Sequence, residues 1–446
     1  MGNYKQFERC DDKPVLHTAG EVFPDGSILE LIRIPNGDPS FLIWSGKSAA
    51  TAAQFARHGE TFIPPRLDAT IRRALRLPSN TAEYGSTREL FVKISNLISR
   101  TTQEADDLVQ LVTFFVLTTW LIESLPVAPC LWIVSPPTTT PAPLMQVLGL
   151  LCRRALVVSD ISATGVGALM DLQPTLMTEV FNPTRRLLNL LRGSSRHGAL
   201  TALGGRFIDT CSAKLLFARE PLRGPESVGF PFELVLRQAR GYVPLMSAAE
   251  AESIAAEFQA QLLSYRFRSM HKLRAPVFDL SQFTVPMREF AYSLGACVVD
   301  DDELQARIVP LLKPVDREIR VDHTSLLSAI TLEVLLARCH TSTGRYVPVV
   351  ELADDVSTVL RGRGELLDVS PEKIGWVLRS LGLRTDFVLA GRKGLVLSNE
   401  GREKVHQLAA GYGVRTLREL PEKISCSLCA GLVPQLKPNA TSEAVS

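Results

Sequence analysis

The sequence has almost no excess of charge and no long hydrophobic run. Its 446 residues include 49 Lys or Arg and 47 Asp or Glu, which gives a formal net charge of +2. No global field therefore marks the chain as a nucleic-acid or membrane binder, and any such role must come from a local patch. The most apolar stretch, residues 108–122, is shorter than the roughly 20 residues that span a bilayer. We expect a core helix there and no membrane partner.

Cysteine is also scarce. The eight Cys residues are scattered along the chain, which is too sparse for a disulfide scaffold. The first residues have no apolar core after their charges, so we expect no secretory signal and a cytoplasmic protein with reduced thiols. Cys426 and Cys429 form one CxxC pair, whereas structural zinc needs four ligands. They are weak metal candidates, and unliganded thiols are the simpler interpretation.

Common catalytic signatures are missing as well. The chain contains no HExxH, GxSxG or GxGxxG motif, so nothing supports a zinc peptidase, a hydrolase triad or a dinucleotide cofactor. A GKS tripeptide at 46–48 lies between a predicted strand and an Ala-rich segment predicted to be helical. The position five residues before Gly46 is Phe41, inside that strand, which leaves no length for a loop around phosphates. We interpret the tripeptide as a surface turn.

What the chain does have is apolar matter for several cores, with 46% hydrophobic residues. Residues 1–104 are predicted to hold a β-rich module followed by helices. Turn sequences at 23–26 and 35–39 bound predicted strands at 27–34 and 40–44. The helical spacing of apolar residues predicts helices over 68–77, 87–101 and 104–125.

Residues 105–240 alternate short apolar runs with helical segments, a pattern typical of a parallel sheet with helices on both faces. The predicted strands are 131–134, 155–158, 175–180, 213–218 and 232–236. The predicted helices between them are 143–153, 162–170 and 183–192. The expected fold class is therefore α/β, with a doubly wound sheet at its centre.

The remainder is predicted to form three parts. Residues 241–342 are mainly helical, 343–420 form a winged helix-turn-helix, and 421–446 are a polar tail that contains the CxxC pair. In the winged helix, Ser370 is the expected N-cap, Pro371 the first helical residue and Gly382 the stop. Two short strands are expected to pair around residues 391–394.

Three stretches carry a resemblance to a known family. TTWLIESLPVAPCLWIVSP (118–136), DISATGVGALMDLQPTLMTEV (160–180) and FIDTCSAKLLFARE (207–220) resemble the P-loop (AAA+/helicase-type) ATPase domains of phage and plasmid replication helicase or primase proteins. In those relatives a winged helix similar to VSPEKIGWVLRSLGLRTDFVLAGRKGLVL (369–397) closes the chain. The resemblance covers about 105–240 and 343–413. It implies a P-loop NTPase-like fold, with DNA and replication proteins as partners and ATP with Mg²⁺ as the cofactor of active members.

The phosphate-binding motif of that family is degenerate here. In G-x-x-x-x-G-K-[ST], glycines let backbone N–H groups wrap the phosphates, Lys reaches the β and γ oxygens, and Ser or Thr holds Mg²⁺. Pro141 stands at the Lys position and Ala142 at the hydroxyl position, and proline supplies no N–H. The corresponding loop is Ser135, Pro136, Pro137, Thr138, Thr139, Thr140, Pro141 and Ala142. We expect it not to cradle a triphosphate in the usual way.

The third strand departs from the family in the same direction. A Walker B strand ends in Asp, which holds the metal shell, followed by Glu, which orients water. Here Thr178 precedes Glu179, so the metal carboxylate is absent. We interpret Glu179 as a remnant with a structural role.

Basic residues in the expected winged helix are the DNA-binding candidates. Such groups contact phosphates while the second helix enters a groove. The candidates are Lys373, Arg379, Arg384, Arg392 and Lys393. The alternative is a winged helix used for packing or protein contact. A second basic stretch, Arg185 to His197, is interpreted as a solvated helix face.

The sequence therefore predicts a non-catalytic, DNA-associated protein without a cofactor: a degenerate P-loop ATPase fold with a winged helix that binds DNA or a replication partner. One alternative is an active ATPase or helicase with an atypical nucleotide site. Another is a protein-interaction scaffold without a nucleic-acid role. The missing glycines and lysine argue against the ATPase, and the basic residues favour DNA over the scaffold. The sequence leaves the oligomeric state open.

Overall fold

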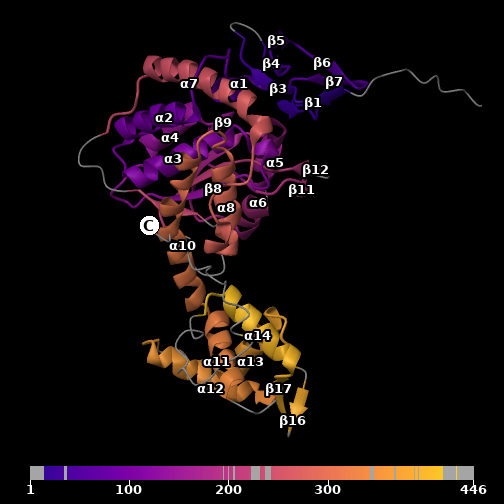
Figure 1. Cartoon of the computed structure of the whole chain (residues 1–446), viewed down its shortest axis with the longest axis vertical. Coiled ribbons are helices and arrows are strands. Elements are labelled where there is room, and N and C mark those ends of the chain that lie inside the picture. The colour runs from indigo at the N-terminus through magenta and orange to yellow at the C-terminus, as the bar shows by residue number, and fades with distance from the viewer. Residues whose placement is uncertain are drawn as a thin grey trace, which may run out of the picture. The chain divides into compact units, whose positions relative to one another are not determined.

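The computed structural model folds into two compact units, Met1–Asp316 and Arg317–Ser446 (Figure 1). The residues that it describes are 15–34, 38–193, 195–198, 200–203, 206–221, 232–236, 243–341, 346–365, 368–385, 387–389, 391–414 and 428. The five-part division made from the sequence stays a prediction. Among the described helices, none combines the length and apolar character that crossing a bilayer requires.

The N-terminal module of the first unit contains two small sheets. The strands are β1 (Val15–His17), β2 (Gly20–Val22), β3 (Ile28–Ile32), β4 (Ser40–Trp44), β5 (Ala49–Ala52), β6 (Phe55–Arg57) and β7 (Glu60–Ile63). One sheet has the order β2-β3-β4-β5 and the other β1-β7-β6. Leu29, Leu31 and Phe41 are fully buried, and they pack in one hydrophobic cluster with Ala19 and Phe62.

The segment after the GKS tripeptide was predicted to be helical, and that prediction is wrong. It forms β5, which pairs antiparallel with β4 so that Ala50 faces Ile43. The amide of Ser45 donates to the carbonyl of Ser48 at 3.0 Å, and Gly46 takes a φ of +88° that glycine adopts without strain. The tripeptide is thus the turn of a β-hairpin, because pairing with β4 outweighs the helical preference of Ala.

Three helices connect this module to the central sheet. They are α1 (Ala69–Ala74), α2 (Thr87–Thr102) and α3 (Asp106–Thr119), followed by the 3₁₀ turn η1 (Ile122–Ser124). Ser86 and Glu89 form a capping box at the start of α2. The predicted helix over 104–125 ends early, at Thr119, where the indole N–H of the fully buried Trp120 donates to the carbonyl of Leu151 at 3.0 Å.

A five-stranded parallel sheet flanked by helices lies at the centre of the first unit, as the sequence predicted. Its strands are β8 (Cys130–Val134), β9 (Ala155–Val158), β10 (Thr175–Val180), β13 (Lys214–Ala218) and β14 (Glu233–Val235), in the order β14-β8-β13-β10-β9. The helices are α4 (Ala142–Leu151), α5 (Ala163–Leu169) with η2 (Met170–Leu172), and α6 (Arg185–Gly193). Cys130, Trp132 and Val134 pack with α5 and α6, and α4 contacts α2 and α7.

Other elements of the first unit include one that the sequence did not indicate. The antiparallel ribbon of β11 (Leu200–Leu203) and β12 (Arg206–Asp209) lies between α6 and β13 in the chain. The remaining helices are α7 (Ala248–Ser269), η4 (Met270–Lys272), η5 (Leu280–Gln282), α8 (Val285–Ala296) and α9 (Asp302–Ala306), and α10 (Ile308–Ser325) begins in this unit and continues past its last residue, Asp316. Arg307 separates α9 from α10.

A buried ion-pair network joins the N-terminal module to the central sheet. Glu30 on β3 is fully buried and pairs with Arg153 (2.6 Å), Arg154 (2.8 Å) and Arg266 (2.9 Å). Arg153 and Arg266 also pair with Glu123, at 2.7 and 2.9 Å. Burial alone would raise the pKa of Glu30, but the three guanidinium groups hold it below its usual value. These charges therefore connect β3, η1, the α4–β9 turn and α7.

The second unit combines helices with a three-stranded antiparallel sheet of order β15-β17-β16. Its elements are α11 (Leu327–Thr341), β15 (Tyr346–Pro348), α12 (Val349–Gly362), α13 (Pro371–Ser380), β16 (Phe387–Leu389), β17 (Arg392–Val396) and α14 (Asn399–Gly411). In Figure 1, β16 and β17 lie at one end of this unit. One core includes Leu335 on α11, Val356 on α12, Leu378 on α13 and Val405 on α14.

Candidate functional site

The loop and strand end singled out in the sequence lie at one edge of the parallel sheet. Val134 on β8 is level with Ala218 on β13, and Ala218 is level with Val180 on β10. The loop that starts at Ser135 and the end of β10 therefore emerge at the same carboxyl edge, where ligands bind in many open α/β sheets. Because β13 lies between them, β8 and β10 are separated by about 10 Å.

Several hydrogen-bond donors of loop 135–142 are bonded within the protein. The amide of Ser135 donates to Ala218 (2.7 Å) and that of Thr139 to Pro136 (2.8 Å). The hydroxyl of Thr139 bonds the same carbonyl and lies 2.9 Å from the Ser135 hydroxyl. Pro136, Pro137, Pro141 and Pro143 have no N–H. Of the loop's backbone, the amides of Thr138 and Thr140 have no such bond among the described residues.

Arg219 binds this loop, and the sequence analysis did not identify it. It directly follows β13, and its guanidinium lies 3.4 Å from the carbonyl oxygens of both Ser135 and Thr139. A phosphate loop presents N–H groups inward, whereas here carbonyl groups face a cation. The signal available in the sequence was an Arg that directly follows a predicted strand of the parallel sheet.

Glu179 lies in β10, level with Phe217 of β13, and is partly buried. The hydroxyl of its neighbour Thr178 donates to the Glu179 carbonyl at 3.2 Å. Among the described residues, no metal-binding cluster of three or more His, Cys, Asp or Glu is present. The role of Glu179 as a remnant stays a prediction.

Lys214 is buried in the same sheet but does not replace the missing lysine of the loop. It begins β13, whose carboxyl end is four residues further on, so it lies about 13 Å from that edge. Its Nζ donates to the Ser212 carbonyl at 2.5 Å. Burial lowers the pKa of Lys214 to about 8, offset in part by Cys130 and Cys211 nearby. This lysine belongs to the interior of the sheet.

The five predicted DNA-binding cations are exposed, and all lie in the second unit. Lys373 and Arg379 are on α13, Arg384 follows it, and Arg392 and Lys393 begin β17. None of the five has an acidic partner among the described residues of this chain. Arg379 donates from Nε to the carbonyl of Gly375, one turn earlier in α13, at 3.2 Å.

Short-range interactions fix the start of α13 and the β16–β17 hairpin. The Ser370 hydroxyl caps α13 by accepting from the Lys373 amide at 3.4 Å, and Pro371 occupies the first turn. Gly391 takes a φ of +75° between β16 and β17. Tyr346 of β15 donates from its hydroxyl to the Arg392 carbonyl, and its ring covers Gly394, where a Cβ would lie 2.5 Å from the ring. The hairpin is thereby attached to β15.

Other arginines of the same unit differ from these five because they have acidic partners. Arg338 pairs with Asp355 (2.5 Å), and Arg363 pairs with Glu333 (2.5 Å). Arg361 lies 3.8 Å from Asp368. The arginines on or next to α11 and α12 thus have acidic partners, whereas the cations of α13 and the hairpin have none among the residues that the structure describes.

Trp376 is the residue of this face that the sequence analysis missed. It lies on α13, and 65% of its surface is exposed. Ile374, Val377 and Leu378 fill the buried face of the same helix. The helical spacing of these three apolar residues already implied that position 376 points away from the core.

Two residues of the other basic stretch have partners within the protein. Arg196 pairs with Glu289 at 2.9 Å, and His197 lies 2.8 Å from the carbonyl of Ile122. Cys426 and Cys429 lie outside the described residues, so the interpretation of the CxxC pair stays a prediction.

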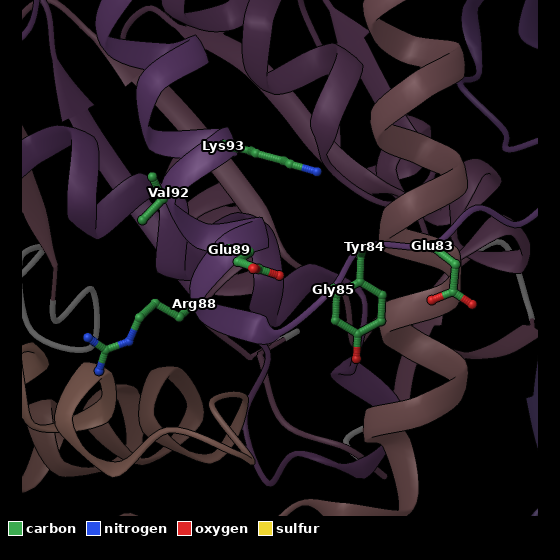
Figure 2. Close-up of a pocket in the computed structure, with 7 residues that line it drawn as sticks. All are labelled: Glu83, Tyr84, Gly85, Arg88, Glu89, Val92 and Lys93. Carbon is green, nitrogen blue, oxygen red and sulfur yellow. The ribbon is translucent and has the colours of Figure 1, made fainter.

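A shallow depression on the first unit is lined by residues around the start of α2 (Figure 2). Its lining residues are Glu83, Tyr84, Gly85, Arg88, Glu89, Val92 and Lys93. Arg88 is paired with Glu303 (2.7 Å) and Asp301, and Glu89 accepts from the Ser86 amide at 2.9 Å. These polar groups cap α2 and attach it to α9, which accounts for them structurally.

Comparisons with known proteins leave the chain without a family. No family model matches it, and no curated protein matches it. One similar solved structure is the apo C-terminal region of NrS-1, residues 305–718, at 10% identity. That similarity covers 83% of this chain and 96% of the other, with a TM-score of 0.33. A TM-score this low supports no conclusion about function.

Proposed function

We propose that the chain is a DNA-associated protein whose second unit contacts the phosphates of duplex DNA. The observation that carries the proposal is the set of five exposed cations without an acidic partner among the described residues: Lys373, Arg379, Arg384, Arg392 and Lys393. An exposed cation that has no protein partner is available to an anionic ligand, and phosphate contacts supply most non-specific DNA affinity.

In this proposal the second unit is a winged helix. The succession of α12, α13 and the β16–β17 hairpin, with β15 as third strand, supports that assignment. The exposed face of α13 would lie against the DNA, and Arg392 and Lys393 at the start of β17 would contact the backbone of the duplex beside it. Any partner in replication rests on the resemblance of the sequence segments alone.

The central sheet would serve as a scaffold rather than as a nucleotide site of the P-loop kind. The proline-rich loop 135–142, whose Ser135 and Thr139 amides are bonded within the protein, supports this part of the proposal. So does Arg219, which binds carbonyl oxygens of the loop. We propose no catalytic role for Glu179 and no cofactor.

The test is the salt dependence of duplex binding by the full chain. Arg392→Ala with Lys393→Ala removes two phosphate contacts, and each contact contributes about 0.9 to the slope of log K against log salt. The double variant should therefore bind duplexes of any sequence more weakly, with a slope smaller in magnitude by about 1.8. Fluorescence anisotropy at several salt concentrations measures both quantities.

A charge-matched control separates contact from net charge. Arg72→Ala with Arg73→Ala on α1 removes the same two charges from an exposed helix of the first unit, and it should leave the slope unchanged. If Arg392→Ala with Lys393→Ala behaves like this control, the hairpin does not contact DNA. A protein-interaction role would then be the better account of the second unit.

A further inference from the structure

Trp376 occupies the middle of the basic face of α13. At about 3.6 residues per turn, Lys373 and Arg379 flank it on either side. Its side chain is 65% exposed, whereas Ile374 and Leu378 on the opposite face are fully buried. An exposed indole between two cations offers a ligand a flat apolar surface next to positive charge.

We propose that Trp376 stacks on an unpaired base, so that the ligand of this face is DNA with single-stranded nucleotides next to a duplex. This inference rests on the proposed function and names the DNA structure that the same face recognises. Lys373 and Arg379 would hold the phosphates on either side of the base. Arg384, Arg392 and Lys393 would contact the adjoining duplex.

The chemistry of the indole favours a base face over a groove. The edges of base pairs in the major groove are mostly hydrogen-bond donors and acceptors. An indole has one N–H donor and no acceptor, so it would desolvate these edges without satisfying them. Stacking buries one face of the indole against one face of a base, and every base offers such an apolar face.

Charge favours DNA over an apolar protein surface as the occupant. Lys373 and Arg379 lie on α13, and Arg384 follows this helix. None of the three has an acidic partner among the described residues, and Glu372 is the acidic residue on the exposed face of α13. A protein partner that covered Trp376 would have to bury or neutralise these cations. Phosphates on both sides of a stacked base do so directly.

Fluorescence can report Trp376 separately in the full chain. Of the four tryptophans, Trp120 is fully buried, Trp132 is 3% exposed, and Trp44 is stacked on Phe267. Acrylamide should therefore quench Trp376 far more than the other three. A forked DNA should quench this fraction and protect it from acrylamide, while a blunt duplex of the same length should have little effect.

Two substitutions of similar size separate stacking from bulk. Trp376→Leu keeps an apolar side chain but cannot stack, and it should weaken binding to forked and single-stranded DNA by about 5- to 150-fold. Trp376→Phe should keep most of that affinity. Both variants should bind blunt duplex within about twofold of the parent, and thermal melts should confirm that both fold.

Three results would overturn the inference. Trp376→Leu could bind forked DNA as tightly as the parent, or lose duplex and forked binding equally, which would indicate a groove contact. Trp376 could also resist acrylamide in the DNA-free protein, which would indicate that it is covered by a second copy or by another part of the chain. A different result would contradict the proposed function: the Arg392 and Lys393 double variant would leave duplex binding unchanged.

Discussion

The carboxyl edge of the central sheet and the basic face of the second unit use their polar groups in opposite ways. At the sheet edge, Ser135 and Thr139 bond within the protein, and Arg219 binds their carbonyl oxygens. On the basic face, Lys373 and Arg392 have no acidic partner among the described residues. Both regions were singled out from the sequence by residue type. Whether a polar group is available to a ligand therefore depends more on its partners than on its residue type.

The buried network around Glu30 extends the comparison within the first unit. Its arginines are the same residue type as Arg379 of α13, yet they lie in the interior with carboxylate partners at 2.6–2.9 Å. Removing one member of such a network leaves buried charges with fewer partners of opposite sign. The buried charges of this network should therefore affect stability, whereas charge on the basic face should affect binding.

The largest expected effect is on stability. Glu30→Gln removes the carboxylate that faces Arg153, Arg154 and Arg266, and it should lower the free energy of unfolding by about 3–5 kcal/mol. Urea denaturation followed by circular dichroism measures the change. Glu252→Gln is the matched control, because Glu252 is 62% exposed and pairs with Arg76 at the surface. The control should change stability by less than about 1 kcal/mol.

The same measurement on Arg392→Ala with Lys393→Ala sharpens the comparison. Because these side chains are exposed and without acidic partners among the described residues, their loss should leave the unfolding free energy nearly unchanged. The contrast between stability and binding would fail if the hairpin variant were destabilised as strongly as Glu30→Gln.

A smaller effect is expected from pH, at a histidine pair inside the second unit. His340 on α11 and His406 on α14 approach at 3.1 Å between their Nε2 atoms, and Nδ1 of His406 lies 2.7 Å from the Arg402 carbonyl. That carbonyl can only accept, so Nδ1 of His406 donates, and its neutral ring accepts at Nε2 from His340. Protonating both rings would place two N–H groups against each other.

Burial, followed by His406 and Arg402, lowers the pKa of His340. A group whose pKa is lower in the folded state binds its proton more readily when unfolded. Stability should therefore be complete above the unfolded pKa of about 6.5, and it should fall as the pH drops from there through the folded pKa. Urea denaturation between pH 8 and pH 5, as an approximate range about the usual His pKa, should show this loss. His340→Gln should flatten the profile, and a variant with the unchanged profile of the parent would assign the loss to other groups.

The smallest expected effect is a null result at the sheet edge. Calorimetry of the full chain with Mg·ATP should show no micromolar site, because the loop has neither the lysine nor the glycines of a phosphate loop and bonds two of its amides internally. Arg219→Ala should release the loop without creating a site, since the prolines remain. Saturable binding that Thr139→Ala abolishes would instead place a nucleotide at this edge and remove the contrast between the two regions.

Much of the local structure was readable from the sequence. The strands β4, β9 and β10 have their predicted limits, because each is a short apolar run bounded by turn residues. Ser370 and Pro371 marked the start of α13 correctly, since capping depends on the nearest residues alone. The ribbon of β11 and β12 was not predicted, although two adjacent glycines between the short runs 200–203 and 206–209 are a typical hairpin signal in the sequence.

The sequence by itself determined the parallel α/β sheet, the chemistry of loop 135–142 and the position of the basic residues, because these follow from periodicity and residue type. Only the tertiary structure decided which charges are buried, which are paired and which are exposed. Arg153 and Arg392 look alike in the sequence, but one is buried against Glu30 and the other lies exposed on a hairpin. The physical reason is that the free energy of a charge depends on its solvation and its partners, and both come from residues distant in the chain.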